Sequence, residues 1–177
     1  MQYTAHYESP LGGLLLAADD VGLTGLWFDG EKYYALHLAR EHEMRQTAVH
    51  EQTAAWLDVY FSGREPDFMP PLHLIGTPFQ QEVWALLRQI PYGKTTTYGA
   101  LAKTLAAQRG LERMSAQAVG GAVWHNEISI LVPCHRVVGT GGSLTGYAGG
   151  VDKKKALLEL EGVSMEGLFV PKRGTAL

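Results

Sequence analysis

The chain has 177 residues, 46% of them hydrophobic and 19% charged, and a formal net charge of -3 at pH 7. Its single cysteine excludes an internal disulfide framework and any zinc site built from several cysteines. No apolar run approaches the roughly 18 residues of a membrane span, and no signal pattern opens the chain, so we expect a soluble, cytoplasmic protein.

Charge is divided unevenly along the chain. Residues 1–72 carry 11 Asp and Glu against 4 Lys and Arg, whereas residues 73–177 carry 7 against 11. A basic excess in the second part is typical of proteins that meet phosphates, although solvated surfaces also vary in charge. The charge alone leaves both nucleic-acid binding and an ordinary surface open.

The first part of the chain predicts a small sheet followed by helices. Residues 3–29 contain three short β-rich runs that end at turn signals such as Ser9-Pro10, which is typical of antiparallel strands. A polar helical pattern over 31–43 predicts one helix, and apolar spacing over 50–61 predicts a second. Residues 64–71 hold three of the eight prolines and indicate a linker.

The linker predicts two domains, made of residues 1–72 and residues 73–177. The second domain opens with Thr77-Pro78-Phe79-Gln80, a capping box that starts a helix with proline at its first position. The patterns that follow predict a mainly helical domain.

Two short helices in the second domain predict a helix-turn-helix. One starts near Thr97, and a loop rich in Arg and Gly over 108–114 separates it from a helix capped by Ser115. This helix, residues 116–124, has no Arg, Lys or Asn to contact base edges in a major groove. Its small residues permit close approach to a minor groove or tight packing inside the protein, and the sequence leaves both open.

The only cysteine, Cys134, lies between Pro133 and His135 after an apolar run. An enclosed thiol without a partner behaves as an inert small hydrophobe, whereas a thiol beside an imidazole can become the reactive thiolate. The pair alone therefore leaves open a core cysteine beside an unrelated histidine and a nucleophile beside its base.

A glycine-rich segment, residues 139–150, follows the cysteine. Because no Gly-Lys-Ser/Thr run is present, a backbone wall around a small pocket, floored by Tyr147, is a better interpretation than a phosphate loop, and the sequence leaves a plain surface loop open. The helix expected over 151–161 carries the run Lys153-Lys154-Lys155, which is typical of a solvated face, and ends with Glu161.

Together these motifs resemble those of the O6-alkylguanine–DNA alkyltransferases, also called methylated-DNA–protein-cysteine methyltransferases. The resemblance runs from about Thr77 to Val163. In chain order it is carried by the helix with Tyr98, Ala118-Val119-Gly120-Gly121, Pro133-Cys134-His135-Arg136, Tyr147-Ala148-Gly149-Gly150 and Leu160-Glu161-Gly162.

The resemblance implies an α/β (α+β) fold of two domains. The N-terminal domain is expected to be ribonuclease-H-like with a three-stranded antiparallel sheet, and the C-terminal domain mainly helical with a helix-turn-helix. The implied activity is irreversible, single-turnover transfer of the alkyl group from O6-methylguanine in double-stranded DNA to the cysteine. O4-methylthymine is a further expected substrate, and no cofactor and no metal are expected.

The resemblance also assigns roles to individual residues. Cys134 is expected to be the nucleophile, His135 to take its proton through a water molecule, and Glu161 to orient the imidazole. Asn126 is expected to tie the recognition helix to the active-site turn, and Tyr98 to donate to the departing guanine oxygen. Substrate contacts are expected from Val137, Tyr147, Ala148 and Lys154. DNA contacts are expected from Ser115, Ala116, Gln117, Ala118, Gly120, Gly121, Arg136, Arg109 and Arg113.

The sequence departs from the family pattern at three points. Gln117 stands where relatives carry an arginine that enters the base stack, so either Gln117 or an arginine of the loop over 106–114 is expected to fill the space of a flipped-out nucleotide. Glu127 stands where a proline is common. The amino-terminal zinc ligands of some members are missing.

Two other functions are compatible with parts of the sequence. An alkyltransferase-like protein would bind the lesion without removing it, but in that class the cysteine is replaced, commonly by tryptophan. A cysteine hydrolase built on Cys134, His135 and Glu161 would turn over, whereas a thioether has no easy route to hydrolysis. We therefore expect a monomeric alkyl acceptor that binds DNA through the minor groove.

Overall fold

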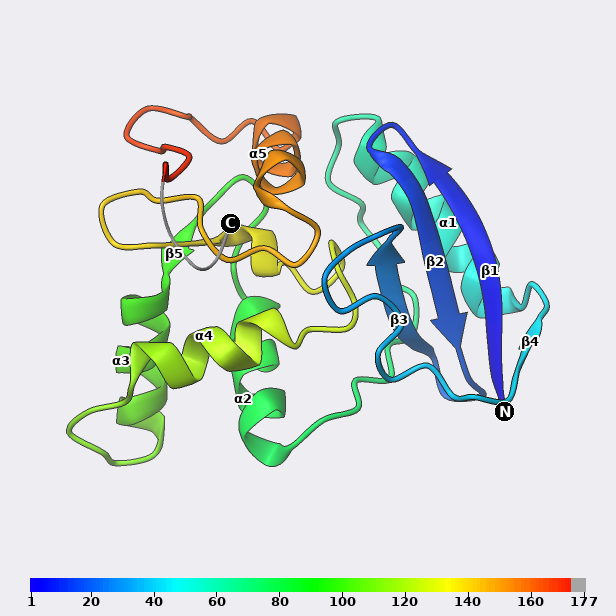
Figure 1. Ribbon diagram of the computed structural model, residues 1–177, viewed down its shortest axis with the longest axis horizontal. Coiled ribbons are helices and arrows are strands. Elements are labelled where there is room, and N and C mark those ends of the chain that lie inside the picture. Colours follow the sequence, from blue (N-terminus) through cyan, green and yellow to red (C-terminus); the bar gives the residue numbers. More distant parts are fainter. Residues whose placement is uncertain (173–177) are drawn as a thin grey trace. The chain divides into compact units, whose positions relative to one another are not determined.

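The computed structural model describes residues 1–172, which form two compact units (Figure 1). One unit comprises Met1–Ile75 together with the short segment Glu127–Ser129. The other comprises Gly76–Asn126 and the chain from Ile130 onward. The chain therefore leaves the second unit for three residues and returns to it shortly before the cysteine.

The first unit contains a four-stranded sheet in the order β3-β2-β1-β4. Strands β1 (Gln2–Ser9), β2 (Gly12–Ala18) and β3 (Leu23–Phe28) are antiparallel neighbours, as the three β-rich runs predict. The short strand β4 (His42–Met44) adds to β1 in parallel and was not predicted. Every residue of β3 is buried and every residue of β4 is exposed, so the core of this unit forms away from the β4 edge.

A single long helix, α1 (Ala48–Phe61), packs on β1, β2 and β3 (Figure 1). Its buried residues recur at helical spacing, with Trp56, Leu57 and Tyr60 the largest of them, so its apolar face lies on the sheet. The helix predicted over 31–43 is wrong, because this stretch forms turns followed by β4. Ala35 has a positive φ of 51°, a conformation that no α-helix contains.

The segment Glu127–Ser129 completes the first unit beside β3. Leu26 of β3 is hydrogen-bonded to both ends of this segment. Its N–H donates to the Glu127 carbonyl at 2.8 Å, and its carbonyl accepts from the Ser129 N–H at 3.1 Å. The buried Glu127 carboxylate accepts from the indole N–H of Trp27 at 2.7 Å and lies 2.8 Å from Nδ1 of His37. A glutamate at this position is therefore held by both its backbone and its side chain.

The second unit is mainly helical. Its elements are α2 (Pro78–Leu87), β5 (Thr96–Thr97), α3 (Tyr98–Gln108), α4 (Ala116–Trp124), the 3-10 helical turn η1 (Cys134–Arg136), β6 (Val137–Val138) and α5 (Val151–Leu160). The predicted capping box starts α2, where Thr77 and Gln80 each bond the other's backbone. Helices α3 and α4 pack on each other, and Ser115 caps α4 as expected, so the predicted pair of helices is present.

Two very short strands bring separate parts of this unit together. Thr96 and Thr97 of β5 pair in parallel with Val137 and Val138 of β6. Because Tyr98 follows β5 directly and η1 precedes β6 directly, this pairing places the start of α3 beside the turn that holds the cysteine. No helix within residues 1–172 is long and apolar enough to cross a membrane.

Candidate active site

Cys134 is the first residue of η1, and it is buried. The turn is closed by hydrogen bonds on both sides of the cysteine: the N–H of Cys134 donates to the Val132 carbonyl at 2.8 Å, and that of Arg136 donates to the Pro133 carbonyl at 3.0 Å. The sulfur is therefore attached to a rigid, hydrogen-bonded turn rather than to a free loop.

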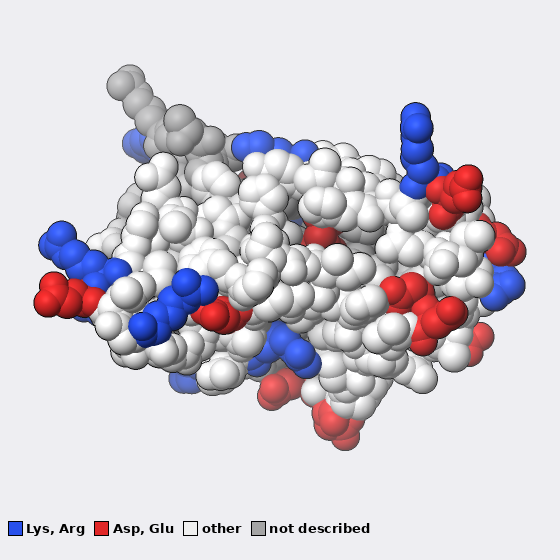
Figure 2. Space-filling model, turned by 90° about the horizontal axis from the view of Figure 1, so that it is seen from below, with Lys and Arg blue, Asp and Glu red and all other residues white. Residues whose placement is uncertain are grey.

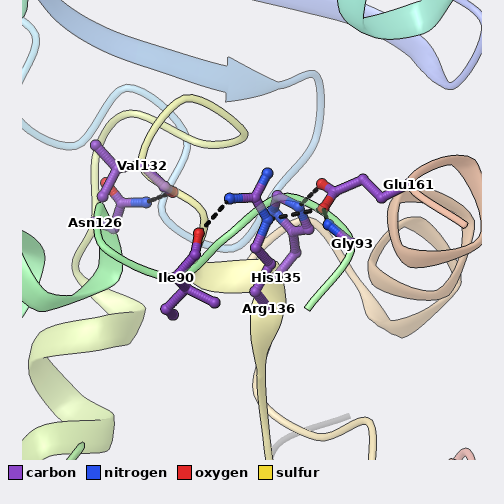
Figure 3. Close-up of polar contacts among 7 residues, drawn as sticks. All are labelled: Ile90, Gly93, Asn126, Val132, His135, Arg136 and Glu161. Carbon is purple, nitrogen blue, oxygen red and sulfur yellow. Dashed lines mark hydrogen bonds and ion pairs between the residues drawn. The ribbon is translucent and has the colours of Figure 1, made fainter. Parts of the chain in front are cut away.

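The amide of Asn126 reaches this turn from just beyond the end of α4. Its Nδ2 donates to the Val132 carbonyl at 2.8 Å (Figure 3) and to the sulfur of Cys134 at 3.3 Å. An N–H directed at sulfur stabilises a thiolate more than a thiol, because hydrogen bonds to charged acceptors are stronger. The side chain thus connects α4 to the cysteine turn.

His135 and Arg136, which directly follow the cysteine in η1, form a buried cluster with Glu161 (Figure 3). Glu161 directs Oε2 to Nε2 of His135 at 2.5 Å and Oε1 to Nε of Arg136 at 2.8 Å. The same Oε1 accepts from the backbone N–H of Gly93 at 3.1 Å, and Nη1 of Arg136 donates to the Ile90 carbonyl at 2.8 Å. The side chains of His135 and Glu161 are 0% exposed, so the pair is shielded from bulk water.

The cluster fixes the protonation of its members. Burial would raise the pKa of Glu161, but His135 and the always-charged Arg136 outweigh burial and lower it to about 2. Burial lowers the pKa of His135, and the nearby positive charges of Arg136 and Lys154 lower it further. The Glu161 carboxylate raises this pKa but does not outweigh burial. The histidine is therefore neutral at neutral pH beside an ionised glutamate.

The neutral imidazole can exist in only one tautomer here. A carboxylate can only accept hydrogen bonds, so Nε2 carries the proton and Nδ1 carries the lone pair. Nδ1 is buried and has no hydrogen-bond partner among residues 1–172. His135 therefore has the electronic form of a general base.

Lys154 is buried, which corrects the expectation that the lysine run forms a solvated face. Its Nζ donates to the carbonyls of Val137 at 2.5 Å and Thr145 at 2.8 Å, and lies 6.0 Å from the centre of the Tyr98 ring. Burial lowers its pKa to about 8, and the nearby Cys134 opposes that shift. The structure thus holds a cation close to the cysteine, in the part of the chain predicted to contact substrate.

The hydroxyl of Tyr98 lies in the same region. It donates to the carbonyls of Thr145 at 3.3 Å or Gly146 at 3.5 Å, and accepts from the indole N–H of Trp124 at 3.4 Å. Burial, together with Cys134, raises the pKa of Tyr98 to about 12, although the Trp124 bond acts in the opposite direction. The phenol therefore keeps its proton at neutral pH and is a hydrogen-bond donor.

The glycine-rich segment and the end of η1 supply the other expected substrate contacts. Tyr147 is buried with its ring edge-to-face to His135 at 6.4 Å, and Ala148 is half-buried beside it. The carbonyls of Cys134 and Val137 already accept from the Val137 N–H and from Lys154, respectively. Each carbonyl keeps a second lone pair that a substrate amine can use.

The two glycines of α4 are not explained by packing inside the protein, although Ala122 of the same helix is buried. A Cβ added at Gly121 would meet nothing within 4 Å, and one at Gly120 would meet only the Tyr98 ring at 3.8 Å, an ordinary contact. The exposed residues at the start of the helix are Ser115, Ala116, Gln117 and Ala118. Of the two interpretations that the sequence left open, this geometry favours close approach by a ligand from outside.

A cavity of about 630 Å³ borders this open side of α4. Tyr98 lies at its wall together with Gln117, both glycines, Trp124 and Thr145. The cavity is thus bordered by Tyr98 and by the glycine side of α4.

The two arginines between α3 and α4 differ in their surroundings. Arg109 pairs with Glu82 at 2.8 Å and stacks its guanidinium 5.2 Å from the centre of the Phe79 ring. Arg113 is exposed and borders a second cavity, of about 480 Å³, beside the start of α4. Arg113 is therefore the less constrained of the two.

Arg136 is mostly buried, unlike Arg113. Its side chain is only 10% exposed and its donors are directed at Glu161 and the Ile90 carbonyl. This arginine therefore stabilises the carboxylate beside His135 inside the second unit, and its contact with DNA stays a prediction. Sequence reasoning also missed Trp124, whose aromatic ring at the end of a small-residue helix was the available signal.

Charged side chains of both signs are scattered over one face of the molecule (Figure 2). The Lys and Arg side chains seen there lie singly or near Asp and Glu, and much of the face carries no charge. The basic excess of the second part is therefore not gathered into one large patch on this face.

Two family models match the chain. One is the DNA binding domain of 6-O-methylguanine DNA methyltransferase, over residues 78–163, and the other is the ribonuclease-like domain of the same protein, over residues 2–74. The matches confirm the predicted combination of a ribonuclease-like part and a DNA-binding part in a mixed α/β fold.

Similar whole proteins cover most of the chain. Methylated-DNA–protein-cysteine methyltransferase of Mycobacterium bovis is 43% identical over 88% of this chain and 92% of its own length, and that of Methanosarcina acetivorans is 41% identical over 90% and 98%. The crystal structure of Mycobacterium tuberculosis OGT in complex with DNA has a TM-score of 0.76 at 41% identity, covering 90% of this chain and 92% of that one.

Proposed function

Because this chain belongs to the 6-O-methylguanine DNA methyltransferase family and is a direct-reversal DNA repair protein, we propose that Cys134 is the residue that accepts the alkyl group. The observation that carries the proposal is the position of this cysteine. It is buried in a closed turn, receives the amide N–H of Asn126, and adjoins a neutral histidine whose free lone pair is set by Glu161.

The nucleophile is formed by proton transfer from the thiol. Nδ1 of His135 takes the proton through a water molecule, and the resulting imidazolium is stabilised by the Glu161 carboxylate. The thiolate is stabilised by the Asn126 N–H and by the nearby charge of Lys154. The sulfur then attacks the alkyl carbon attached to guanine O6.

The departing base is the second place where charge develops. As the sulfur–carbon bond forms, the electron pair of the carbon–O6 bond moves to O6, and the hydroxyl of Tyr98 donates to that oxygen. The backbone N–H of Ala148 adds a second donor, and Tyr147 packs along the base. Guanine takes its proton from Tyr98, the phenol recovers a proton from the His135 imidazolium through water, and the methyl group stays on sulfur as a thioether, so the reaction consumes one protein for each lesion.

DNA is the partner, and we propose that α4 enters its minor groove. The support is the open side of α4, where glycines leave room that no neighbouring side chain fills. A narrow groove requires such close backbone approach. Phosphate contacts are expected from Ser115 at the helix start and from the exposed Arg113.

The lesion must leave the base stack before it can meet a buried thiol. Gln117 is exposed at the start of α4 and borders the cavity beside Tyr98, so we propose that its side chain fills the space left in the stack. Arg113 is the alternative, whereas Arg109 is held by Glu82. We further propose that the protein acts as a monomer in the cytoplasm, with O6-alkylguanine preferred.

A labelling experiment with free base tests the assignment of Cys134. A fluorescent O6-benzylguanine should label the wild-type protein and leave Cys134→Ser unlabelled, while His135→Ala should slow labelling roughly 10²- to 10⁴-fold through loss of the base. Thermal unfolding of each variant checks that it is folded. Labelling of Cys134→Ser at the wild-type rate would overturn the proposal.

A further inference from the structure

Trp124, the last residue of α4, brings an indole N–H to the hydroxyl of Tyr98. Its Nε1 lies 3.4 Å from the phenolic oxygen, and its side chain borders the cavity of about 630 Å³. None of the steps derived above uses this residue.

The contact is held by close packing rather than by a flexible side chain. A Cβ at Gly146 would lie 2.4 Å from Nε1 of Trp124 and 2.7 Å from the hydroxyl of Tyr98. Gly146 also has a φ of 81°, which side-chain-bearing residues rarely adopt. The indole edge, the phenol and the main chain of residue 146 therefore form one tightly packed group.

The indole N–H leaves the proton of the phenol available to another acceptor. An indole N–H can only donate, whereas a phenol has one proton to donate and lone pairs to accept. Trp124 occupies a lone pair of Tyr98 and so leaves the single proton for another acceptor. The Thr145 carbonyl, one acceptor within reach, is already bonded by Lys154 at 2.8 Å.

We propose that Trp124 is a positioning residue that directs the Tyr98 proton toward the departing purine oxygen and stabilises the charge left on the phenol. As the carbon–O6 bond breaks, its electron pair moves to O6, and the proton of Tyr98 is shared with that oxygen. The negative charge that grows on the phenol is met by the indole N–H, which remains in place throughout. The inference rests on the proposed role of Tyr98.

The shift of the Tyr98 pKa agrees with this geometry. Burial raises the pKa to about 12, and the bond from Trp124 is the cause that acts against burial. A donor to the phenolic oxygen makes the phenol a stronger acid and therefore a better proton donor to the leaving base.

A double-mutant cycle tests the inference. Labelling rates with O6-benzylguanine are measured for wild type, Trp124→Phe, Tyr98→Phe and the double variant. Trp124→Phe, which keeps an aromatic ring but loses the N–H, should be roughly tenfold slower than wild type, the size expected for one hydrogen bond to a charged group. In the Tyr98→Phe background the same change should have no further effect, because the residue acts through the hydroxyl.

A substrate series and a matched variant separate this role from packing. The base that departs from O6-benzyl-8-bromoguanine is a stronger acid than guanine and needs less help from a proton donor. With this substrate, Trp124→Phe should therefore decrease the labelling rate by a smaller factor than with O6-benzylguanine. The matched variant Trp84→Phe removes the hydrogen bond from the Trp84 indole of α2 to the Ala122 carbonyl of α4. Its labelling rate should decrease only slightly, and by the same factor with both substrates. Trp124→Leu, which also lacks the N–H, should behave as Trp124→Phe does.

The outcomes distinguish the inference from its premise. Equal slowing by Trp124→Phe in both Tyr98 backgrounds, or no slowing at all while Tyr98→Phe is slow, would overturn the role of Trp124 alone. A Tyr98→Phe variant as fast as wild type would overturn the proposed role of Tyr98, and the inference with it.

Discussion

At the scale of single residues, the site depends on one carboxylate with two buried partners. Glu161 faces His135 with one oxygen and Arg136 with the other, and each of those side chains is nearly inaccessible to water. Arg136 keeps the carboxylate ionised, and the ionised carboxylate fixes the tautomer of His135. The arginine of the cysteine motif thus influences the histidine through the shared carboxylate.

This arrangement predicts a specific dependence of stability on pH. The pKa of Glu161 is about 2 in the folded protein against an ordinary value of 4.5. As the pH falls, the Glu161 carboxylate is therefore protonated in the unfolded chain before it is protonated in the folded protein. The free energy of unfolding consequently decreases as pH falls from 4.5 toward 2. The lowered pKa of His135 acts in the same direction below its ordinary value of 6.5. Urea unfolding of the wild type over this range should show a steep loss.

Glu161→Gln should be less stable than wild type by about 3–5 kcal/mol at neutral pH, because two buried groups lose their charged partner. Its free energy of unfolding should also fall less steeply between pH 4.5 and 2. Glu159→Gln, an exposed change on α5, is the control and should keep the wild-type slope. Parallel curves for Glu161→Gln and wild type would contradict the account.

At the scale of elements, α4 combines a cap, an open glycine face and a C-terminal end at the active site. Ser115 starts the helix, Gly120 and Gly121 leave one side free, and Trp124 ends it at Tyr98. Asn126 follows and holds the cysteine turn. One short helix therefore combines the face proposed to meet DNA with contacts to the groups proposed to react.

The residue at the start of α4 predicts a difference between DNA and free base. Gln117→Arg should speed transfer from an O6-methylguanine duplex several-fold, because a guanidinium can stack and also meet phosphates, and should leave the rate with free O6-benzylguanine unchanged. Arg113→Ala is the companion variant. If Gln117→Arg has no effect and Arg113→Ala slows only the duplex reaction, the loop arginine and not Gln117 fills the stack.

The sequence predicted the elements whose signals are local. Turn residues divided the three antiparallel strands, a capping box started α2, and Ser115 marked the start of α4. The helix expected over 31–43 is not formed, because a polar helical pattern does not stabilise a helix without tertiary packing; the chain forms turns and an edge strand there.

Features set by distant contacts were not predictable. The burial of Lys154 depends on the carbonyls of Val137 and Thr145, which lie in two other segments. Nothing in the run Lys153-Lys154-Lys155 distinguishes the buried lysine from its two neighbours. The return of Glu127–Ser129 to the first unit depends on bonds to Leu26 and Trp27, a hundred residues away. The direction of Arg136 is set by Glu161, which lies on a different element.

At the scale of the whole molecule, the division into two units places the chemistry in one of them. All groups proposed to act on the alkyl group or the base lie in the second unit, from Tyr98 on α3 to Glu161 at the end of α5. The first unit contributes an independent core around β3 and holds the three-residue segment that precedes the cysteine turn. Because the proposed thioether on Cys134 has no easy route to hydrolysis, the reaction is expected to alter the protein permanently.

The central claim is a single, irreversible methyl transfer to Cys134. The protein is incubated with an excess of duplex DNA containing O6-methylguanine, and its intact mass, its peptides and the repaired DNA are measured together. We predict one added methyl group per chain, located on the peptide that contains Cys134, with one mole of guanine restored per mole of protein and none on further incubation. A methyl group on any other residue, or more than one lesion repaired per chain, would contradict the account.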